Sequence, residues 1–286
     1  MVLRITLLVL GVFACSTAVI FIKESREHAI LLSSYRLLVA ALALTPLFIR
    51  DYRKHRDSYT RAHLYACLLP GVALGLHFIT WIIGARMTDA VNASLIVNLV
   101  PIVMPFLMLI MVQERLTRRE LVGTVLALVG LLVLSGADYK LNLEHFWGDV
   151  LCFVSMLLFS YYLALARKNR HFQSTWLYVV PLYYVAGVFC FVTALFFVNP
   201  VKAYPAREIA LVLALGIIPT VVGHSILNHS LKNLRGQIVS IVNMGQFIFA
   251  GIMAYIFLAE VPAATFYVAC LLVVAGAYIA IREGDQ

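Results

Sequence analysis

Ten long apolar stretches, separated by short polar connections, dominate the pattern of this chain. Each is close to the roughly 20 apolar residues that a helix needs to cross the hydrocarbon core of a bilayer. The pattern therefore predicts an all-α membrane protein with ten transmembrane helices. The expected helices are 5–22, 31–49, 64–83, 91–112, 120–136, 147–166, 175–198, 208–230, 237–258 and 262–281.

The composition agrees with this pattern. Of 286 residues, 63% are hydrophobic and only 13% are charged, and the mean hydropathy is +0.94. A soluble domain is about half apolar and about a quarter charged. A cytosolic enzyme, a nucleic-acid-binding module and a disordered protein are therefore excluded.

The first apolar stretch, 5–22, follows Arg4 and is similar to a secretory signal peptide. Its removal would leave an odd number of helices and would disturb the distribution of charge between the two sides of the membrane. We therefore expect this stretch to remain in the protein as the first transmembrane helix.

Lysine and arginine are unevenly shared between the loops on the two sides of the membrane. With a cytoplasmic N-terminus, fifteen lie in the cytoplasm: Arg4, Arg50, Arg53, Lys54, Arg56, Arg61, Arg115, Arg118, Arg119, Arg167, Lys168, Arg170, Lys232, Arg235 and Arg282. Six lie outside: Lys23, Arg26, Arg86, Lys140, Lys202 and Arg207. Positive loops stay inside, so we expect a multi-pass protein of the inner or plasma membrane with both termini cytoplasmic. The net charge of +8 is spread over these loops, which argues against a nucleic-acid partner.

The chain also lines up with itself at a shift of 146 or 147 residues. The matched positions are His77 with His224, Trp81 with Asn228, Glu114 with Glu260 and Gly130 with Gly276. Each half holds five predicted helices, an odd number, so the second half would enter the membrane in the opposite orientation. The sequence predicts two inverted repeats, 1–138 and 139–286, an architecture of secondary transporters with the substrate site near the midplane. The alternative is a chance similarity between two leucine-rich tracts.

Several motifs carry a resemblance to a known family. In the first half they are segment 85–94, Pro101, segment 113–117, Gly123 and Gly130; in the second they are Gly223, His224, Asn228, Leu231, Ala259, Glu260 and Gly276. Their order and spacing resemble the EamA repeat of the drug/metabolite transporter superfamily over essentially the whole chain. The resemblance implies a ten-helix bundle that exports small metabolites by alternating access, without an ATPase.

The ninth helix departs from the pattern of that family. The second EamA copy often carries a Glu-Pro pair inside the membrane, whereas Gln246 and Phe247 occupy these positions here. Mechanisms that use this glutamate as a proton or cation site do not carry over to this chain.

Polar side chains recur at helical spacing within four of the predicted helices. They are His77 and Trp81 on the third helix, Ser94 and Asn98 on the fourth, His224 and Asn228 on the eighth, and Ser240, Asn243 and Gln246 on the ninth. Polar groups in a bilayer are costly unless they are paired or line a wet cavity, so we expect these stripes to converge on a substrate cavity. The expected substrate-binding residues are His77, Trp81, Asn98, His224, Asn228, Asn243, Gln246, Arg36, Tyr162 and Tyr184, and no residue is expected to be catalytic.

Each of these side chains also has a structural interpretation. Asn, Ser, Gln and His can hydrogen-bond a neighbouring helix, and Trp81 can pack or anchor at the membrane surface. Arg36 either extends to the outer surface or reaches a substrate carboxylate. Tyr162 and Tyr184 belong to a tyrosine-rich pair of helices that can form a cavity wall.

These features favour a secondary active transporter that exports small amphipathic metabolites such as amino acids. The alternatives are an intramembrane enzyme that uses the two histidines and a lipid-scrambling or structural membrane protein. The sequence has no HExxH or GxSxG motif, so we expect no enzymatic activity. It also lacks a Walker A motif, so transport would be driven by an ion or by the substrate gradient, with a proton on His77 or His224 as the candidate coupling ion.

The five cysteines are spread one to an apolar stretch, and no CxxC spacing occurs. We therefore expect no disulfide, no metal site and no cofactor. Ten helices suffice to enclose a cavity, so a monomer is expected rather than a dimer.

Overall fold

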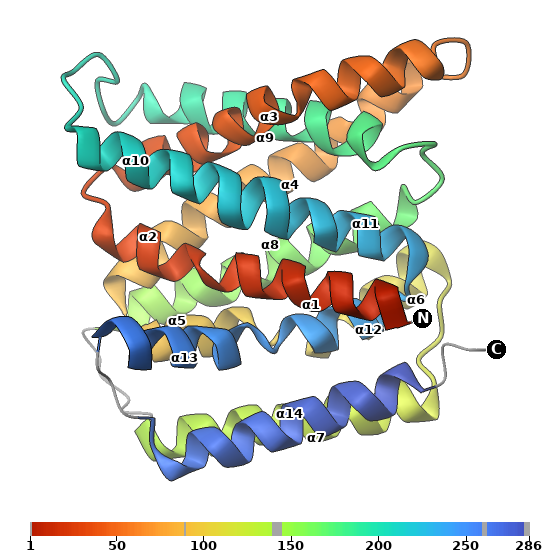
Figure 1. Ribbon diagram of the computed structural model, residues 1–286, viewed down its shortest axis with the longest axis vertical. Coiled ribbons are helices and arrows are strands. Elements are labelled where there is room, and N and C mark those ends of the chain that lie inside the picture. The colour runs from red at the N-terminus through yellow and green to blue at the C-terminus, as the bar shows by residue number, and fades with distance from the viewer. Residues whose placement is uncertain (1, 89, 139–144, 259–261, 283–286) are drawn as a thin grey trace.

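The computed structural model is a bundle of helices that run across the molecule in one common direction or its reverse (Figure 1). It describes residues 2–88, 90–138, 145–258 and 262–282, and these contain no strand. The helices are α1 (Val2–Ser16), α2 (Ala18–Glu24), α3 (Ala29–Lys54), α4 (Arg61–Met87), α5 (Ala90–Val97), α6 (Val100–Val112), α7 (Arg118–Asp138), α8 (Phe146–Lys168), α9 (Thr175–Ala194), α10 (Ala206–Leu215), the π-helix η1 (Gly216–His224), α11 (Ser225–Asn233), α12 (Gly236–Asn243), α13 (Gln246–Leu258) and α14 (Ala264–Ile281).

The apolar stretches coincide with these helices. Within the described residues, nine helical segments are long and apolar enough to cross a membrane. The remaining expected span, 120–136, falls inside α7, which lies alongside α14 at one edge of the bundle (Figure 1). The prediction of a multi-helix membrane protein is confirmed, whereas a tenth crossing and the inverted orientation of the second half stay predictions.

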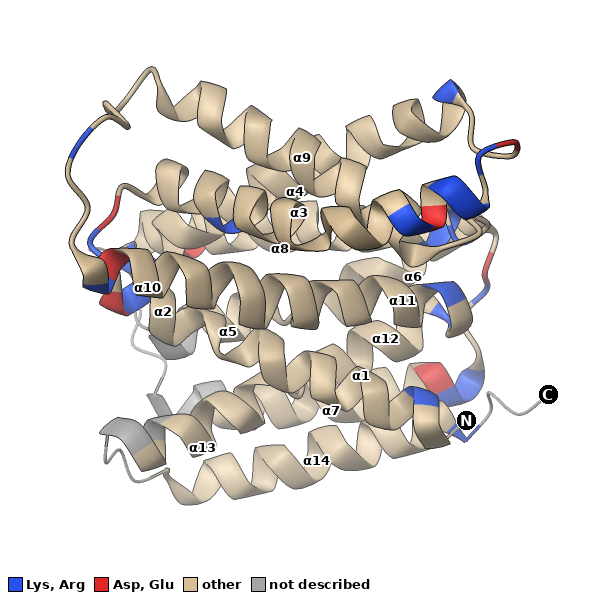
Figure 2. Ribbon diagram, turned by 45° about the horizontal axis from the view of Figure 1, so that its top comes forward, with Lys and Arg blue, Asp and Glu red and all other residues tan. Residues whose placement is uncertain are grey.

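Charged residues gather at the two ends of the bundle and are sparse between them (Figure 2). The end at which α1 begins and α14 finishes carries most of the Lys and Arg. There Glu114 pairs with Arg167 at 2.6 Å and with Arg170 at 2.8 Å, and Glu120 pairs with Arg235 at 2.6 Å. Glu114 therefore ties the α6–α7 connection to the end of α8. Its counterpart in the sequence, Glu260, lies outside the described residues.

Three of the long helices are interrupted rather than continuous. The interruptions are Thr17 between α1 and α2, Asn98 and Leu99 between α5 and α6, and Met244 and Gly245 between α12 and α13. At the first, the Thr17 hydroxyl donates to the Ala14 carbonyl at 2.8 Å. At the second, the Asn98 side chain donates to the Ser94 carbonyl at 2.7 Å. Both carbonyls also accept from a backbone N–H, so the polar side chains add a second hydrogen bond where the helix stops.

A fourth irregularity is η1, which wraps around Pro219. Because proline has no N–H, the Leu215 carbonyl cannot receive the usual helical bond from residue 219. The Thr220 hydroxyl donates to that carbonyl instead, at 3.0 Å. Short π segments inside α-helices occur frequently at functional sites.

Two glycine positions allow close contacts between helices. A Cβ on Gly223 would lie 2.5 Å from Cys15 Sγ, so η1 and α1 can approach only because this residue is glycine. A Cβ on Gly123 would lie 2.4 Å from the Gly276 carbonyl oxygen, which brings α7 and α14 together in the same way. Small residues at helix contacts are typical of membrane bundles.

Candidate functional site

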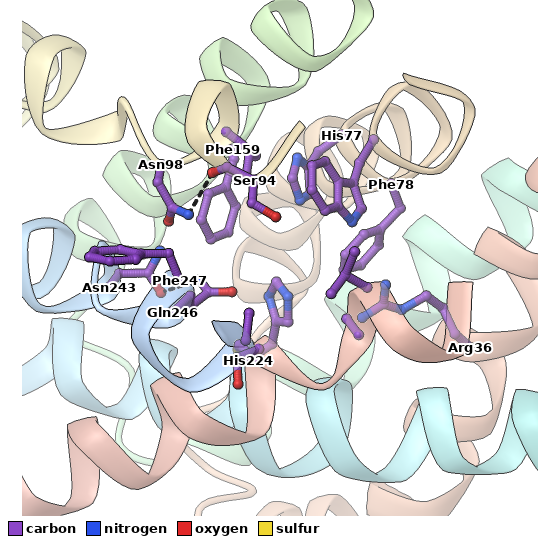
Figure 3. Close-up of a pocket in the computed structure, with 17 residues that line it drawn as sticks. Arg36, His77, Phe78, Ser94, Asn98, Phe159, His224, Asn243, Gln246 and Phe247 are labelled. Carbon is purple, nitrogen blue, oxygen red and sulfur yellow. Dashed lines mark hydrogen bonds between the residues drawn. The ribbon is translucent and has the colours of Figure 1, made fainter. Parts of the chain in front are cut away.

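A cavity lies where the four irregular segments meet. It has a volume of about 60 Å³, which is room for on the order of four water molecules. Its lining residues are Cys15, Ser16, Ala18, Val19, Arg36, His77, Phe78, Trp81, Ser94, Val97, Asn98, Phe159, His224, Asn243, Gln246, Phe247 and Ala250 (Figure 3). Irregular backbone at membrane depth is tolerated where it is buried in protein or lines a cavity, and broken helices surround the substrate site in many transporters.

Seven of the ten residues expected from the sequence line this cavity. They are Arg36, His77, Trp81, Asn98, His224, Asn243 and Gln246. They come from α3, α4 and η1, from the α5–α6 interruption, and from the two helix ends that flank the α12–α13 interruption. Residues far apart in the chain are thus brought together around one space.

The other three expected residues, Asn228, Tyr162 and Tyr184, do not line the cavity. Asn228 lies one turn beyond His224, where its side-chain amide donates to the Tyr162 hydroxyl and, at 2.7 Å, to the His224 carbonyl. The Tyr184 hydroxyl is 2.8 Å from Thr45 Oγ1 on α3. These side chains pair with each other or with a neighbouring helix, which is the structural interpretation of a polar group in a membrane helix.

His77 is held by a hydrogen bond to α8. Its Nδ1 lies 3.0 Å from the Ser155 carbonyl oxygen and 2.8 Å from the Ser155 hydroxyl. Its ring also stacks on Phe159, with centroids 4.7 Å apart. These contacts fix the ring at the cavity wall and join α4 to α8.

His224 sits among aromatic rings instead. The ring centroids of Phe78, Phe159 and Tyr162 lie 5.1, 5.7 and 6.3 Å from its own. Its Nδ1 is buried and has no hydrogen-bond partner. An unsatisfied polar atom in such surroundings is costly, so His224 is available to a ligand or to water in the cavity.

Three amide side chains form the opposite wall: Asn98 lies in the α5–α6 interruption, and Asn243 and Gln246 lie on either side of the α12–α13 interruption. Gln246 Nε2 donates to Asn243 Oδ1 at 2.8 Å across the α12–α13 interruption. The NH₂ group of Asn98 donates to the Ser94 carbonyl oxygen, and its Oδ1 is buried without a hydrogen-bond partner. The interruptions therefore place amide groups at the cavity as well as bending the helices.

Arg36 lies inside the bundle, so the expectation that it could extend to the outer surface is wrong. Its side chain is 1% exposed, and its guanidinium carbon lies 3.8 Å from the centroid of Phe78. Nε and Nη2 donate to the Thr220 hydroxyl at 3.1 and 3.0 Å. The ring and the hydroxyl hold the guanidinium at the cavity, where lipid and bulk water do not reach it.

Sequence reasoning overlooked several residues that shape the site. Phe159 provides the ring on which His77 stacks, and Thr220 orients Arg36. An apolar ring within an apolar helix gives no contrast in the sequence, so no signal could have found Phe159. Pro219 beside Thr220 was the available signal for the π-helix.

Comparison with known proteins places this architecture in a family. The model of the EamA-like transporter family matches residues 3–136 and 146–282. The chain belongs to the EamA-like transporter family. A solved crystal structure of a protein shares the fold with a TM-score of 0.78 at 16% identity, covering 99% of this chain and 98% of that one. No curated protein matches the sequence.

In this EamA-like transporter, the described lining of the cavity is basic rather than acidic. Its lining includes one arginine and two histidines, and no carboxylate is among the described residues that line it. No group of three His, Cys, Asp or Glu side chains placed to hold a metal ion occurs in the described part of the chain. The arrangement can bind and orient a small polar solute through hydrogen bonds, aromatic contacts and one positive charge.

Proposed function

We propose that this protein is a secondary active transporter that exports small amphipathic metabolites, such as amino acids, by alternating access. The observation that carries the proposal is the cavity at the four irregular helix segments, which buried polar side chains line. A static scaffold has no need to bury unpaired polar atoms such as His224 Nδ1 and Asn98 Oδ1. Family membership supports transport as the general activity.

The substrate-binding residues in this proposal are those at the cavity. Arg36, His77, Asn98, His224, Asn243 and Gln246 supply hydrogen bonds, and Trp81 supplies an apolar face. Such a mixture suits a solute with polar ends and an apolar middle. Asn228 and Tyr162 support the turn that carries His224 and do not contact the solute.

For the orientation in the membrane and the oligomeric state, the proposal keeps the expectations from the sequence, which are cytoplasmic termini and a monomer. The excess of Lys and Arg at the end where α1 begins supports cytoplasmic termini (Figure 2). One chain supplies all the described residues that line the cavity, which supports a monomer.

A proton is the coupling ion that this site could carry without a carboxylate. Replacing both histidines, with His77→Gln and His224→Gln, should then flatten the pH dependence of the reduced transport that remains. An unchanged pH profile rejects proton coupling through these histidines and leaves the substrate gradient as the driving force.

Transport is tested directly with purified protein in liposomes. The experiment measures flux of radiolabelled amino acids, putrescine, uridine and glucose 6-phosphate, with protein-free liposomes and a fluorescent phospholipid as controls. Saturable flux of one class, reduced by His224→Gln and not by His229→Gln, supports the proposal; His229 lies on α11 outside the cavity lining. Flux of the phospholipid alone favours lipid scrambling, and conversion of a solute without flux favours an enzyme.

A further inference from the structure

Arg36 has one hydrogen-bonding nitrogen that the protein does not use. The Thr220 hydroxyl accepts hydrogen bonds from Nε and Nη2 and donates its own hydrogen to the Leu215 carbonyl. Both of its lone pairs and its one hydrogen are then used, so it cannot accept a further bond from Nη1. Nη1 is buried and has no partner. Holding α3 to η1 accounts for two of the nitrogens but leaves the third unexplained.

The positive charge of Arg36 also lacks a counter-ion. No ion pair of the described residues includes it, and those that are formed lie at the ends of the bundle. Phe78 contributes a cation–π contact, which is weaker than a carboxylate partner. A buried charge is costly unless it is paired and hydrogen-bonded, so the site is incomplete until an anion binds.

The opposite side of the cavity has the complementary deficiency. Asn98 Oδ1 is a buried acceptor without a donor, since the NH₂ group of the same side chain is used by Ser94. Figure 3 shows Asn98 and Arg36 on opposite sides of the cavity, with His77, Phe159 and His224 between them. Arg36 Nη1 thus lacks an acceptor on one side of the cavity, and Asn98 Oδ1 lacks a donor on the other side. Aromatic rings lie between them (Figure 3).

We propose that the substrate is a monocarboxylate whose carboxylate binds Arg36 Nη1 and whose hydrogen-bond donor, such as an ammonium group, binds Asn98 Oδ1. The apolar part of the substrate lies against Phe159 and the ring of His224. This inference rests on the proposed transport function and specifies its substrate chemistry.

The charge of the cavity distinguishes this class from its competitors. A free polyamine would place its positive charges beside Arg36 with no carboxylate in the described lining to offset the repulsion. A phosphate dianion carries two negative charges, whereas Arg36 is the only permanently charged side chain in the described lining. A single carboxylate matches the one charge.

The test uses matched ligands and the fluorescence of Trp81, which lines the cavity. The reporter protein carries Trp147→Phe and Trp176→Phe, which remove the other two tryptophans. 3-Aminopropanoate, 4-aminobutanoate and 5-aminopentanoate, which carry the ammonium and the carboxylate at opposite ends of an apolar chain, are compared with their amides, which lack the carboxylate, and with propanoate, butanoate and pentanoate, which lack the amine. Putrescine, uridine and glucose 6-phosphate represent the other classes.

We expect at least one amino acid to bind, its amide to bind at least tenfold more weakly, and its deaminated acid to bind severalfold more weakly. Arg36→Gln should weaken the acid at least tenfold and the amide less than twofold, and Arg36→Lys should restore part of the difference. Asn98→Leu should remove the preference for the amino acid over its deaminated acid. Arg50→Gln, the same change at the exposed end of the same helix, should alter none of these values.

Equal binding of an acid and its amide in the unaltered protein overturns the inference, and this comparison requires no variant that could fail to fold. Binding of putrescine, uridine or glucose 6-phosphate without any of the carboxylates overturns it as well. In either case, saturable flux of the bound class in liposomes leaves the transport function standing. The absence of flux for every probe rejects the transport function itself.

Discussion

His77 and His224 occupy matched positions in the two halves of the chain, yet their surroundings differ. His77 Nδ1 is bonded to Ser155 on α8, whereas His224 Nδ1 has no partner and is ringed by Phe78, Phe159 and Tyr162. The first histidine is part of the contact between two helices. The second ends a π-helix, lines the cavity and has a buried nitrogen without a partner.

The difference teaches that matched sequence positions do not imply matched roles. A duplicated polar residue keeps its place on the helix, but the helix packed against it decides whether its hydrogen bonds are already made. In this protein the half that contains His224 retains the free group. Four substitutions measure how far the two histidines have diverged.

The largest effect is expected from His224→Ala. Transport should fall at least tenfold, because the variant loses the unpaired nitrogen that is available to solute. The melting temperature should fall less than in His77→Ala, because no protein hydrogen bond of the ring is lost and only its packing against Phe78, Phe159 and Tyr162 is removed. Flux and thermal melting of the same preparation test this, and a drop in melting temperature equal to that of His77→Ala would show that both histidines are structural.

His77→Ala should act mainly on stability. It leaves the Ser155 hydroxyl without its imidazole partner and opens a space against Phe159, at a cost of about 1–3 kcal/mol for the broken buried hydrogen bond. A loss of this size lowers the melting temperature by about 2–4 °C for each kcal/mol in a chain of this order of length. Transport at full activity with an unchanged melting temperature would contradict the contact seen between α4 and α8.

A double-mutant cycle of His77→Ala and Ser155→Ala measures the contribution of the hydrogen bond between these two side chains to stability. Because the two side chains share one hydrogen bond, their effects on the free energy of unfolding should be non-additive by about 1 kcal/mol. A cycle of His224→Ala and Ser155→Ala supplies the control, with expected additivity. Additive effects in the first cycle would mean that the bond contributes nothing to stability.

The smallest effect is expected from Tyr162→Phe, which changes only the support behind His224. Asn228 keeps its bond to the His224 carbonyl at 2.7 Å, so the free energy of unfolding should fall by about 1 kcal/mol or less. Solute affinity should stay within about twofold of the unaltered protein. A large loss of affinity would place Tyr162 at the solute.

The spans and the polar positions could be predicted from the sequence for one physical reason. Lipid provides no hydrogen bonds, so long apolar runs and rare polar groups stand out against each other. This contrast identified Asn98, Asn243 and Gln246, which the structure places at one cavity. Their role in binding substrate stays a prediction.

The roles of the other expected site residues depend on hydrogen-bond partners on neighbouring helices, which the sequence of one helix does not reveal. Asn228 has the same spacing from His224 as Trp81 has from His77, but Tyr162 on another helix uses its amide. Arg36 lies near the start of its helix, and only the packing of η1 against α3 shows that it is buried. Pairing across helices is a tertiary property, so the sequence pattern left both alternatives open.

The side-chain caps at Thr17 and Asn98 bear on the rate at which the bundle could change shape. Bending a continuous helix in lipid exposes backbone carbonyls to a medium of low dielectric constant, and this raises the activation barrier. At these interruptions the carbonyls of Ala14 and Ser94 are already bonded by side chains of the same helix, which travel with them. When the two half-helices tilt against each other, these two carbonyls keep a side-chain partner, which lowers the contribution of the backbone to the barrier for opening the cavity.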